Sequence, residues 1–197
     1  MGNAMADTTA ARPLPFVLES PAFSDGGWIP AVHSQAGLNL SPPLRWHGEP
    51  PQTGSFALLL EDPDAPGGTW IHWVLFNIPA ELHSLPMGLE HSPELANGAR
   101  QGRCWGIHRF ERIGYQGPQP PPGPSHRYRF GLHALKASLP LVPGCSAADL
   151  KRAMAGQLLA RAELTGLYAT RHPAPPAAAP AREREPQSSH GDARNRC

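Results

Sequence analysis

The sequence Gly114-Tyr-Gln-Gly-Pro-Gln-Pro-Pro-Pro-Gly-Pro-Ser-His126-Arg-Tyr128 joins a glycine- and proline-rich loop to the start of an alternating strand. Proline fixes φ at about −65° and has no N–H, so neither a helix nor a central strand can cross Pro118 to Pro124. Gly114, Gly117 and Gly123 permit the positive φ values that a turn requires. The loop ends on an imidazole, a guanidinium and a phenol, which can all donate hydrogen bonds. This pattern indicates a small anion pocket; the alternative is a connector whose last residues simply pack.

The strand that follows this loop is one of three well-marked strands. Ser55 to Glu61 is a short apolar run, which is typical of a strand buried on both faces. Trp70 to Ile78 is aromatic and β-branched, and a period of two would place His72 with Val74 and Phe76, opposite Ile71, Trp73 and Leu75. In the stretch from residue 126 to 135, the same period places one set on one face and two arginines on the other: His126, Tyr128, Phe130 and Leu132 against Arg127 and Arg129.

Shorter elements complete the expected fold. Phe16–Ser20, Trp28–Val32 and Ala162–Tyr168 are further strand candidates. Ser146-Ala-Ala-Asp149 resembles a helix-capping signature, and Leu150, Met154 and Leu158 would form the buried face of that helix. A parallel α/β fold needs a helix between strands, and no helical pattern occurs between Phe56 and Ile78. The sequence therefore predicts an all-β dominated protein, an antiparallel β-sandwich with one or two peripheral helices.

Composition sets the domain organisation. The 197 residues, 40% of them hydrophobic, suit one domain at 16–169. Residues 1–15 read as a flexible arm, and the Ala/Pro/Arg-rich segment 170–197 reads as a disordered tail. A net charge of +1 gives no argument for nucleic acid. No secretory signal and no apolar run long enough to cross a membrane are present. Three cysteines without metal-ligand spacing indicate reduced thiols and a cytoplasmic protein.

Two polar clusters interrupt the apolar strands and are the candidates for chemistry. The first combines Asp62 and Asp64 with His72; the second combines His126 with its two neighbours, Arg127 and Tyr128. A carboxylate beside an imidazole fixes its tautomer and favours its charged form, so His72 held in this way would donate to a phosphate or a carboxylate. The alternative is a core histidine whose nitrogens are satisfied by the backbone.

Other chemistries find less support in the sequence. The chain lacks a Gly-x-Ser-x-Gly elbow, and Ser125 in a proline loop is a poor nucleophile. Cys104 near His108 remains open as a thiol–base pair. His72, His126, His133 and Asp62 could supply the three protein ligands of a metal site, but the sequence lacks the His-x-x-x-His or Cys-x-x-Cys spacing of metal ligands, so no metal is expected. No Walker loop or dinucleotide motif is present, so no nucleotide cofactor is expected either.

Several motifs in order resemble the phosphatidylethanolamine-binding protein family, and most closely its bacterial Raf-kinase-inhibitor-like branch. The resemblance covers about Phe16 to Ala169. It is carried by Asp62-Pro-Asp-Ala-Pro66, His72-Trp-Val, Gly114-Tyr-x-Gly-Pro118 and Pro121-Pro-Gly-x-x-His126-Arg-Tyr128, together with Asn39-Leu-Ser-Pro42 and Gly156-x-Leu-Leu-Ala-x-Ala-Glu-Leu164. Three departures are the long segment 104–112, which bears on the pocket rim, Gln119 in place of cysteine and Gln157 in place of histidine.

The resemblance implies a β-sandwich with a small pocket for phosphate, phosphorylated head groups such as phosphoethanolamine, or a carboxylate. The ligand-binding residues it implies are Asp62, His72, Gly117 (through its backbone N–H), His126 and Tyr128. Supporting residues would be Asp64, Pro66, Trp73, Tyr115, Pro118 and Arg127. In such a site Asp62 could hold a histidine charged or bind an amine.

The function expected from these observations is non-enzymatic anion binding, coupled to a protein partner such as a kinase or protease. The resemblance also makes a homodimer an expectation. The alternative is a small hydrolase that uses Asp62 and His72 as an acid–base pair.

Overall fold

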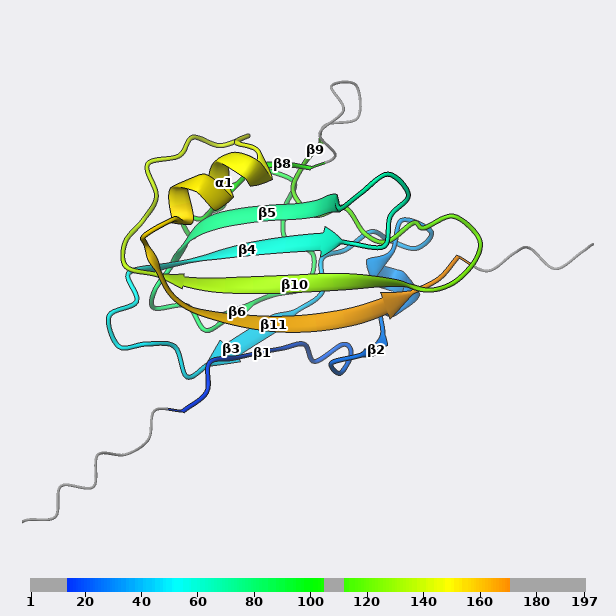
Figure 1. Ribbon diagram of the computed structural model, residues 1–197, viewed down its shortest axis with the longest axis horizontal. Helices are drawn as coiled ribbons and strands as arrows, with labels where there is room; N and C mark the ends of the chain where they lie inside the picture. Colours follow the sequence, from blue (N-terminus) through cyan, green and yellow to red (C-terminus); the bar gives the residue numbers. More distant parts are fainter. Residues whose placement is uncertain (1–13, 105–111, 171–197) are drawn as a thin grey trace, which may run out of the picture.

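The computed structural model describes residues 14–104 and 112–170, and its main feature is a six-stranded sheet in the order β2-β11-β10-β4-β5-β7 (Figure 1). A three-stranded sheet, β1-β3-β6, and a two-stranded one, β8-β9, complete it. The strands are β1 Val17–Glu19, β2 Gly27–Trp28, β3 Leu44–His47, β4 Ser55–Asp62, β5 Trp70–Pro79, β6 Ser84–Leu85, β7 Arg100–Gln101, β8 Arg103–Cys104, β9 Arg112–Ile113, β10 His126–Leu135 and β11 Leu158–Tyr168; the helices are the 3-10 turn η1 Ala31–His33 and α1 Ala147–Met154.

The large sheet is covered on both faces, which makes the fold a sandwich with a peripheral helix. On one face, apolar residues of β4, β5 and β10 form a core with Leu18, Leu44, Trp46 and Leu85 of the three-stranded sheet. On the other face, Leu150 and Met154 of α1 pack against a second group that includes Val74 and Phe76. The prediction of an all-β dominated antiparallel sandwich with a peripheral helix is therefore confirmed, with one parallel pair, β2 beside β11.

The central strands form where the sequence predicted them. β4 is an inner strand between β10 and β5, and its alternating side chains enter the cores on the two faces of the sheet, so its run of apolar residues is buried. In β10 the alternation also holds, because Tyr128, Phe130 and Leu132 belong to the core facing the small sheet. These positions satisfy hydrogen bonding and burial together, which is why the pattern was informative.

Two expectations about the smaller elements were wrong. The chain from Trp28 to Val32 is not a strand, because pairing ends at Trp28 and η1 begins at Ala31. The predicted last strand, Ala162–Tyr168, is confirmed, but it begins earlier, at Leu158. Leu158 is therefore not on the buried face of α1 but in β11, where it is 49% exposed, because the helix ends at Met154 and Gly156 turns the chain at φ 77°. The capping box of Ser146 and Asp149 is confirmed.

A β-bulge in β5 changes the direction of His72. Leu60 pairs with Trp73 and Glu61 pairs with Ile71, so His72 is the extra residue between them. The His72 ring meets Tyr128 edge to face, with ring centroids 5.1 Å apart, on the face where Trp73 packs. The expected grouping was thus wrong for two residues: His72 does not lie with Val74 and Phe76, whereas Ile71 does.

The predicted arm, 1–15, and tail, 170–197, lie almost entirely outside the described residues. Of the rim segment 104–112, only its first and last residues are described, so His108 lies outside the description too. In the two described ranges, no helix is long and apolar enough to cross a membrane.

Candidate functional site

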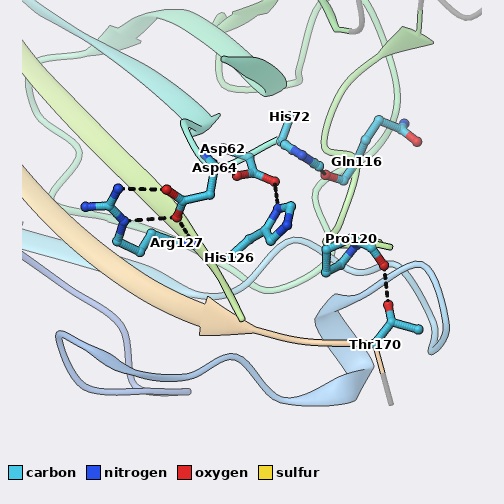
Figure 2. Close-up of polar contacts among 8 residues, drawn as sticks. All are labelled: Asp62, Asp64, His72, Gln116, Pro120, His126, Arg127 and Thr170. Carbon is cyan, nitrogen blue, oxygen red and sulfur yellow. Dashed lines mark hydrogen bonds and ion pairs between the residues drawn. The ribbon is translucent and has the colours of Figure 1, made fainter. Parts of the chain in front are cut away.

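The candidate site lies at one end of the inner strands of the large sheet, where β4 ends and β5 and β10 begin. Antiparallel pairing brings these three chain segments together, because the last residue of β4, Asp62, stands beside the first residues of both neighbours. Asp62, His72 and His126 accordingly lie close to one another in Figure 2. The proline-rich loop before β10 covers these strand ends and contributes one wall of the site.

These elements enclose a cavity of about 410 Å³. Four residues predicted to bind a ligand line it, together with Pro66 from the supporting set. The remaining lining residues were not predicted. The full lining consists of Gln35, Asp62, Ala65, Pro66, Trp70, His72, Gln119, Pro120, Pro121, His126 and Tyr128.

A histidine–carboxylate hydrogen bond and an ion pair join the end of β4 to the start of β10. Nδ1 of His126 donates to Oδ2 of Asp62 at 2.7 Å, and these side chains are 12% and 4% exposed. Arg127 donates through Nε and Nη2 to both carboxylate oxygens of Asp64, at 2.9 and 2.7 Å (Figure 2). The guanidinium hydrogen bond, despite an opposing effect of desolvation, lowers the pKa of Asp64 to about 2. The aspartates thus pair with the second cluster, and the expected pairing of Asp62 with His72 was wrong.

His72 is held by the backbone instead of by a carboxylate. Its Nδ1 donates to the carbonyl oxygen of Gln116 at 2.7 Å, because a carbonyl can only accept. Burial lowers the pKa of His72, and this effect exceeds the opposing effects of the Gln116 carbonyl and Asp62. The ring is therefore neutral at neutral pH, and its Nε2 carries a lone pair. The prediction that His72 is held charged was wrong.

The hydroxyl of Tyr128 is the site's unsatisfied donor. Tyr128 is fully buried, and its oxygen makes no hydrogen bond within 3.5 Å to any described residue; the acceptor that acts on it is the Asp62 carboxylate, at a longer and weaker contact. Burial, and then the negative charge of Asp62, raise the pKa of this phenol, so it stays protonated. An unpaired buried hydroxyl costs about 1–3 kcal/mol, which a ligand oxygen in the cavity would recover.

The loop that closes the pocket is fixed by close backbone contacts. The Gly117 N–H was predicted to bind a ligand. It donates instead to Oδ1 of Asn39 at 2.7 Å, so that prediction was wrong. Gly117 also has no positive φ; it is needed because a Cβ there would lie 2.2 Å from the carbonyl oxygen of His33. Gly114 and Gly123 do take positive φ values, of 88° and 152°. At the rim, the Thr170 hydroxyl donates to the Pro120 carbonyl oxygen at 2.6 Å (Figure 2).

The other supporting residues act from outside the cavity lining. The Tyr115 hydroxyl donates to the His33 carbonyl oxygen at 2.6 Å, and the Trp73 indole donates to Gln101 at 2.8 Å. The carbonyl oxygen of Pro118 accepts from the N–H of Gln35 at 3.1 Å. These contacts fix the walls without reaching a ligand.

The missed lining residues had little signal in the sequence. Gln35 follows the η1 turn, shortly after the stretch Trp28–Val32 that was expected to be a strand. Gln119, Pro120 and Pro121 belong to the loop that was already singled out, but their side chains could not be placed. Trp70 opens β5 and was read as an ordinary strand residue.

Cysteine and metal chemistry receive no support at this site. Cys104 is buried, and its thiol donates to the carbonyl oxygens of His72 and Gly114 at 3.3 and 3.1 Å. Burial raises the pKa of this thiol to about 12, so it is not a ready nucleophile. In the described ranges, no group of three or more His, Cys, Asp or Glu side chains is arranged to hold a metal ion. His133 does not line the pocket.

Comparisons with known proteins identify the family. The family model for phosphatidylethanolamine-binding protein matches residues 19–169. The UPF0098 protein of Methanothermobacter thermautotrophicus is 44% identical over 151 residues, which are 77% of this chain and 97% of that protein. LppC of Mycobacterium tuberculosis, named as a candidate lipoprotein, is 34% identical over 83% of this chain and 77% of its own length.

Two solved structures agree. The Chlamydia trachomatis protein CT736, described as a phosphatidylethanolamine-binding protein homologue, has a TM-score of 0.70 at 36% identity, covering 79% of this chain and 97% of that one. Escherichia coli YbcL, described as a new member of the mammalian family, has a TM-score of 0.72 at 34% identity, covering 79% and 99%. The chain therefore belongs to the phosphatidylethanolamine-binding protein family.

Proposed function

We propose that this chain is a binding protein for a small oxyanion: phosphate, a phosphorylated head group such as phosphoethanolamine, or a carboxylate. The observation that carries the proposal is that Tyr128 lines the cavity while its buried hydroxyl makes no hydrogen bond within 3.5 Å to any described residue. A protonated phenol is a donor to an anionic oxygen. His126 adds a second polar group to the same cavity, and the family's name supports a phosphorylated ligand.

The size and lining of the cavity suit such a ligand. A volume of about 410 Å³ lies within the range of small-molecule sites, roughly 300–1,000 Å³. Trp70 and the prolines of the loop supply apolar walls, and the polar groups gather where the three strands meet. An anion bound at these polar groups would therefore leave space for an organic substituent along the apolar wall.

A binding role fits the lining better than covalent catalysis. Within the part of the chain that the structure describes, no serine, threonine, cysteine or lysine lines the cavity, so the hydroxyl, thiol and amine nucleophiles other than the Tyr128 phenol are absent from its described walls. The Cys104 thiol is engaged by two carbonyl groups on the far side of His72. These contacts support a protein that holds its ligand without converting it.

The test is calorimetric titration with phosphate and with phosphoethanolamine. Tyr128→Phe removes the unpaired donor, and a hydrogen bond to a charged group is worth roughly 1.5–3 kcal/mol, so affinity should fall by about tenfold or more. Tyr168→Phe is the matched control, because the Tyr168 hydroxyl donates to Ser34 outside the cavity. Equal loss in both variants, or no binding by the wild type, would refute the proposal.

The Asp62–His126 pair favours one alternative function, a small hydrolase in which His126 activates a water molecule. This replaces the earlier Asp62–His72 pair, which the geometry does not support. The alternative predicts turnover of a phosphoester that is lost in Asp62→Asn. Binding of the same ester without turnover would favour the binding protein.

The proposal extends to a protein partner, such as a kinase or protease, that recognises the occupied pocket. Affinity capture with immobilised protein, with and without phosphate, tests this part. A partner set that phosphate does not change would remove the coupling and leave anion binding intact. The homodimer and the cytoplasmic location stay predictions.

A further inference from the structure

Among residues 14–104 and 112–170, no arginine or lysine lines the pocket proposed to bind an anion. Arg127 follows His126 directly in the sequence, but it forms a bidentate pair with Asp64 and does not line the cavity. The lining instead contains a carboxylate, that of Asp62, and two imidazoles, His72 and His126. The described lining therefore offers an anion the carboxyl group of Asp62 but no arginine or lysine.

Two of these groups are hydrogen-bond acceptors. Each oxygen of Asp62 accepts one bond from the protein: Oδ1 from the N–H of Asp64 at 2.9 Å and Oδ2 from His126 at 2.7 Å. A carboxylate has about four lone-pair sites, so acceptor capacity remains. Nε2 of the neutral His72 ring is a further acceptor, because Nδ1 is the donor to Gln116. The Tyr128 hydroxyl is the complementary donor.

Donors and acceptors together suit a ligand that has both. An oxyanion without a proton would set a bare oxygen against the Asp62 carboxylate, which is unfavourable because the site is shielded from water. An oxyanion that keeps a proton can instead donate to Asp62 and accept from Tyr128. Inorganic phosphate keeps a proton at neutral pH, because its dianion is still hydrogen phosphate; a phosphate monoester, whose second pKa is about 6, keeps its proton mainly below that pH. Sulfate keeps no proton.

We propose that the pocket selects oxyanions that carry a proton, and that the Asp62 carboxylate accepts the hydrogen bond from the protonated oxygen. The inference rests on the proposed function and narrows its ligand class to hydrogen phosphate, phosphate monoesters in their singly protonated form and similar acids. Sulfate has the same tetrahedral shape and lacks the proton, so it is the discriminating probe.

The experiment is calorimetric titration of the purified full chain with inorganic phosphate and with sulfate at about pH 6.5, where phosphate retains a proton. Phosphate should bind at least about tenfold more tightly than sulfate, because only phosphate can complete a charge-assisted hydrogen bond to Asp62. In Asp62→Asn the ratio of the two affinities should fall towards one, because an amide can donate to sulfate. Glu81→Gln removes a negative charge at an exposed position outside the lining, so it should keep the wild-type ratio.

The outcomes separate this inference from the proposed function. Equal affinities of the wild type for phosphate and sulfate would overturn the selection of a protonated ligand and leave anion binding standing. A wild type that binds neither ion would overturn both. If Asp62→Asn fails to fold, the wild-type ratio still decides, and Tyr128→Phe provides the second variant: it should weaken both ions and leave their ratio unchanged, because its hydroxyl donates to either.

Discussion

Mild acid should destabilise this protein through two buried histidines, His72 and His133, which are 4% and 9% exposed. Burial lowers the pKa of both imidazoles from the ordinary value of 6.5, and the nearby Arg161 adds to the effect at His133. Below that value the unfolded chain binds protons that the folded chain does not. The stability associated with the neutral rings is therefore fully present at higher pH and is lost as the pH falls.

The size of the effect follows from the linkage between proton binding and folding. A histidine that stays neutral in the folded state costs at most about 1.4 kcal/mol of unfolding free energy by about pH 5.5, so two cost at most about 2.7 kcal/mol. Carboxylates whose pKa is lowered, such as Asp64 at about 2, contribute to acid sensitivity only at lower pH. The interval between about pH 7.5 and 5.5 therefore isolates the histidines.

Urea unfolding followed by tryptophan fluorescence at a series of pH values, in a buffer free of phosphate, tests this reasoning. His72→Gln keeps a donor for the Gln116 carbonyl and cannot titrate, so it should show about half the wild-type loss of stability across the interval. His47→Gln, at an exposed position, is the matched control. If His72→Gln loses as much stability as the wild type between these pH values, the assignment of the acid sensitivity to His72 is wrong.

Three further predictions concern the loop, the helix and the buried thiol. Gly117→Ala should lower the free energy of unfolding by about 1–3 kcal/mol or more and weaken phosphate binding, because its Cβ would collide with the His33 carbonyl; a wild-type urea midpoint would contradict this. Ser146→Ala should cost about 1 kcal/mol through the lost cap with Asp149, while phosphate affinity stays at the wild-type value in the same titration. Cys104 should resist iodoacetamide until the protein unfolds, as peptide mapping would reveal; modification of the native protein would show that the thiol is more accessible than its contacts imply.

The central strands could be predicted because their sequences satisfy two requirements at once. Ser55–Asp62 and His126–Leu135 lie next to each other in the sheet; the first buries apolar side chains on both faces, and the second buries every residue from Phe130 onward. A pattern imposed over eight or more residues survives local irregularity. Trp28–Val32 is shorter, and its fate depended on whether a partner strand continued beside it, which the sequence does not encode locally.

The site could be predicted as a set of residues but not as a set of pairs. Asp62 and His126 are 64 positions apart, and their contact depends on the register of β4 against β10, in which Glu61 lies opposite Arg129. Reading along the chain favoured His72 as the partner because it is nearer in sequence. Composition of the strand ends thus indicated which groups gather, whereas register decided which of them touch.

The direction of His72 shows how one irregularity decides what the pocket can do. In a regular strand His72 would share a face with Val74 and Phe76, on the side that α1 covers. Because His72 is an extra residue between the pairs Glu61–Ile71 and Leu60–Trp73, the alternation of faces is interrupted there. The imidazole therefore points to the face where Tyr128 lies. A strict period of two cannot show such a step, because the bulge changes pairing and not composition. The neutral acceptor in the cavity is therefore a product of backbone pairing, and a substitution that restored regular pairing at Glu61 would remove it without changing any lining residue.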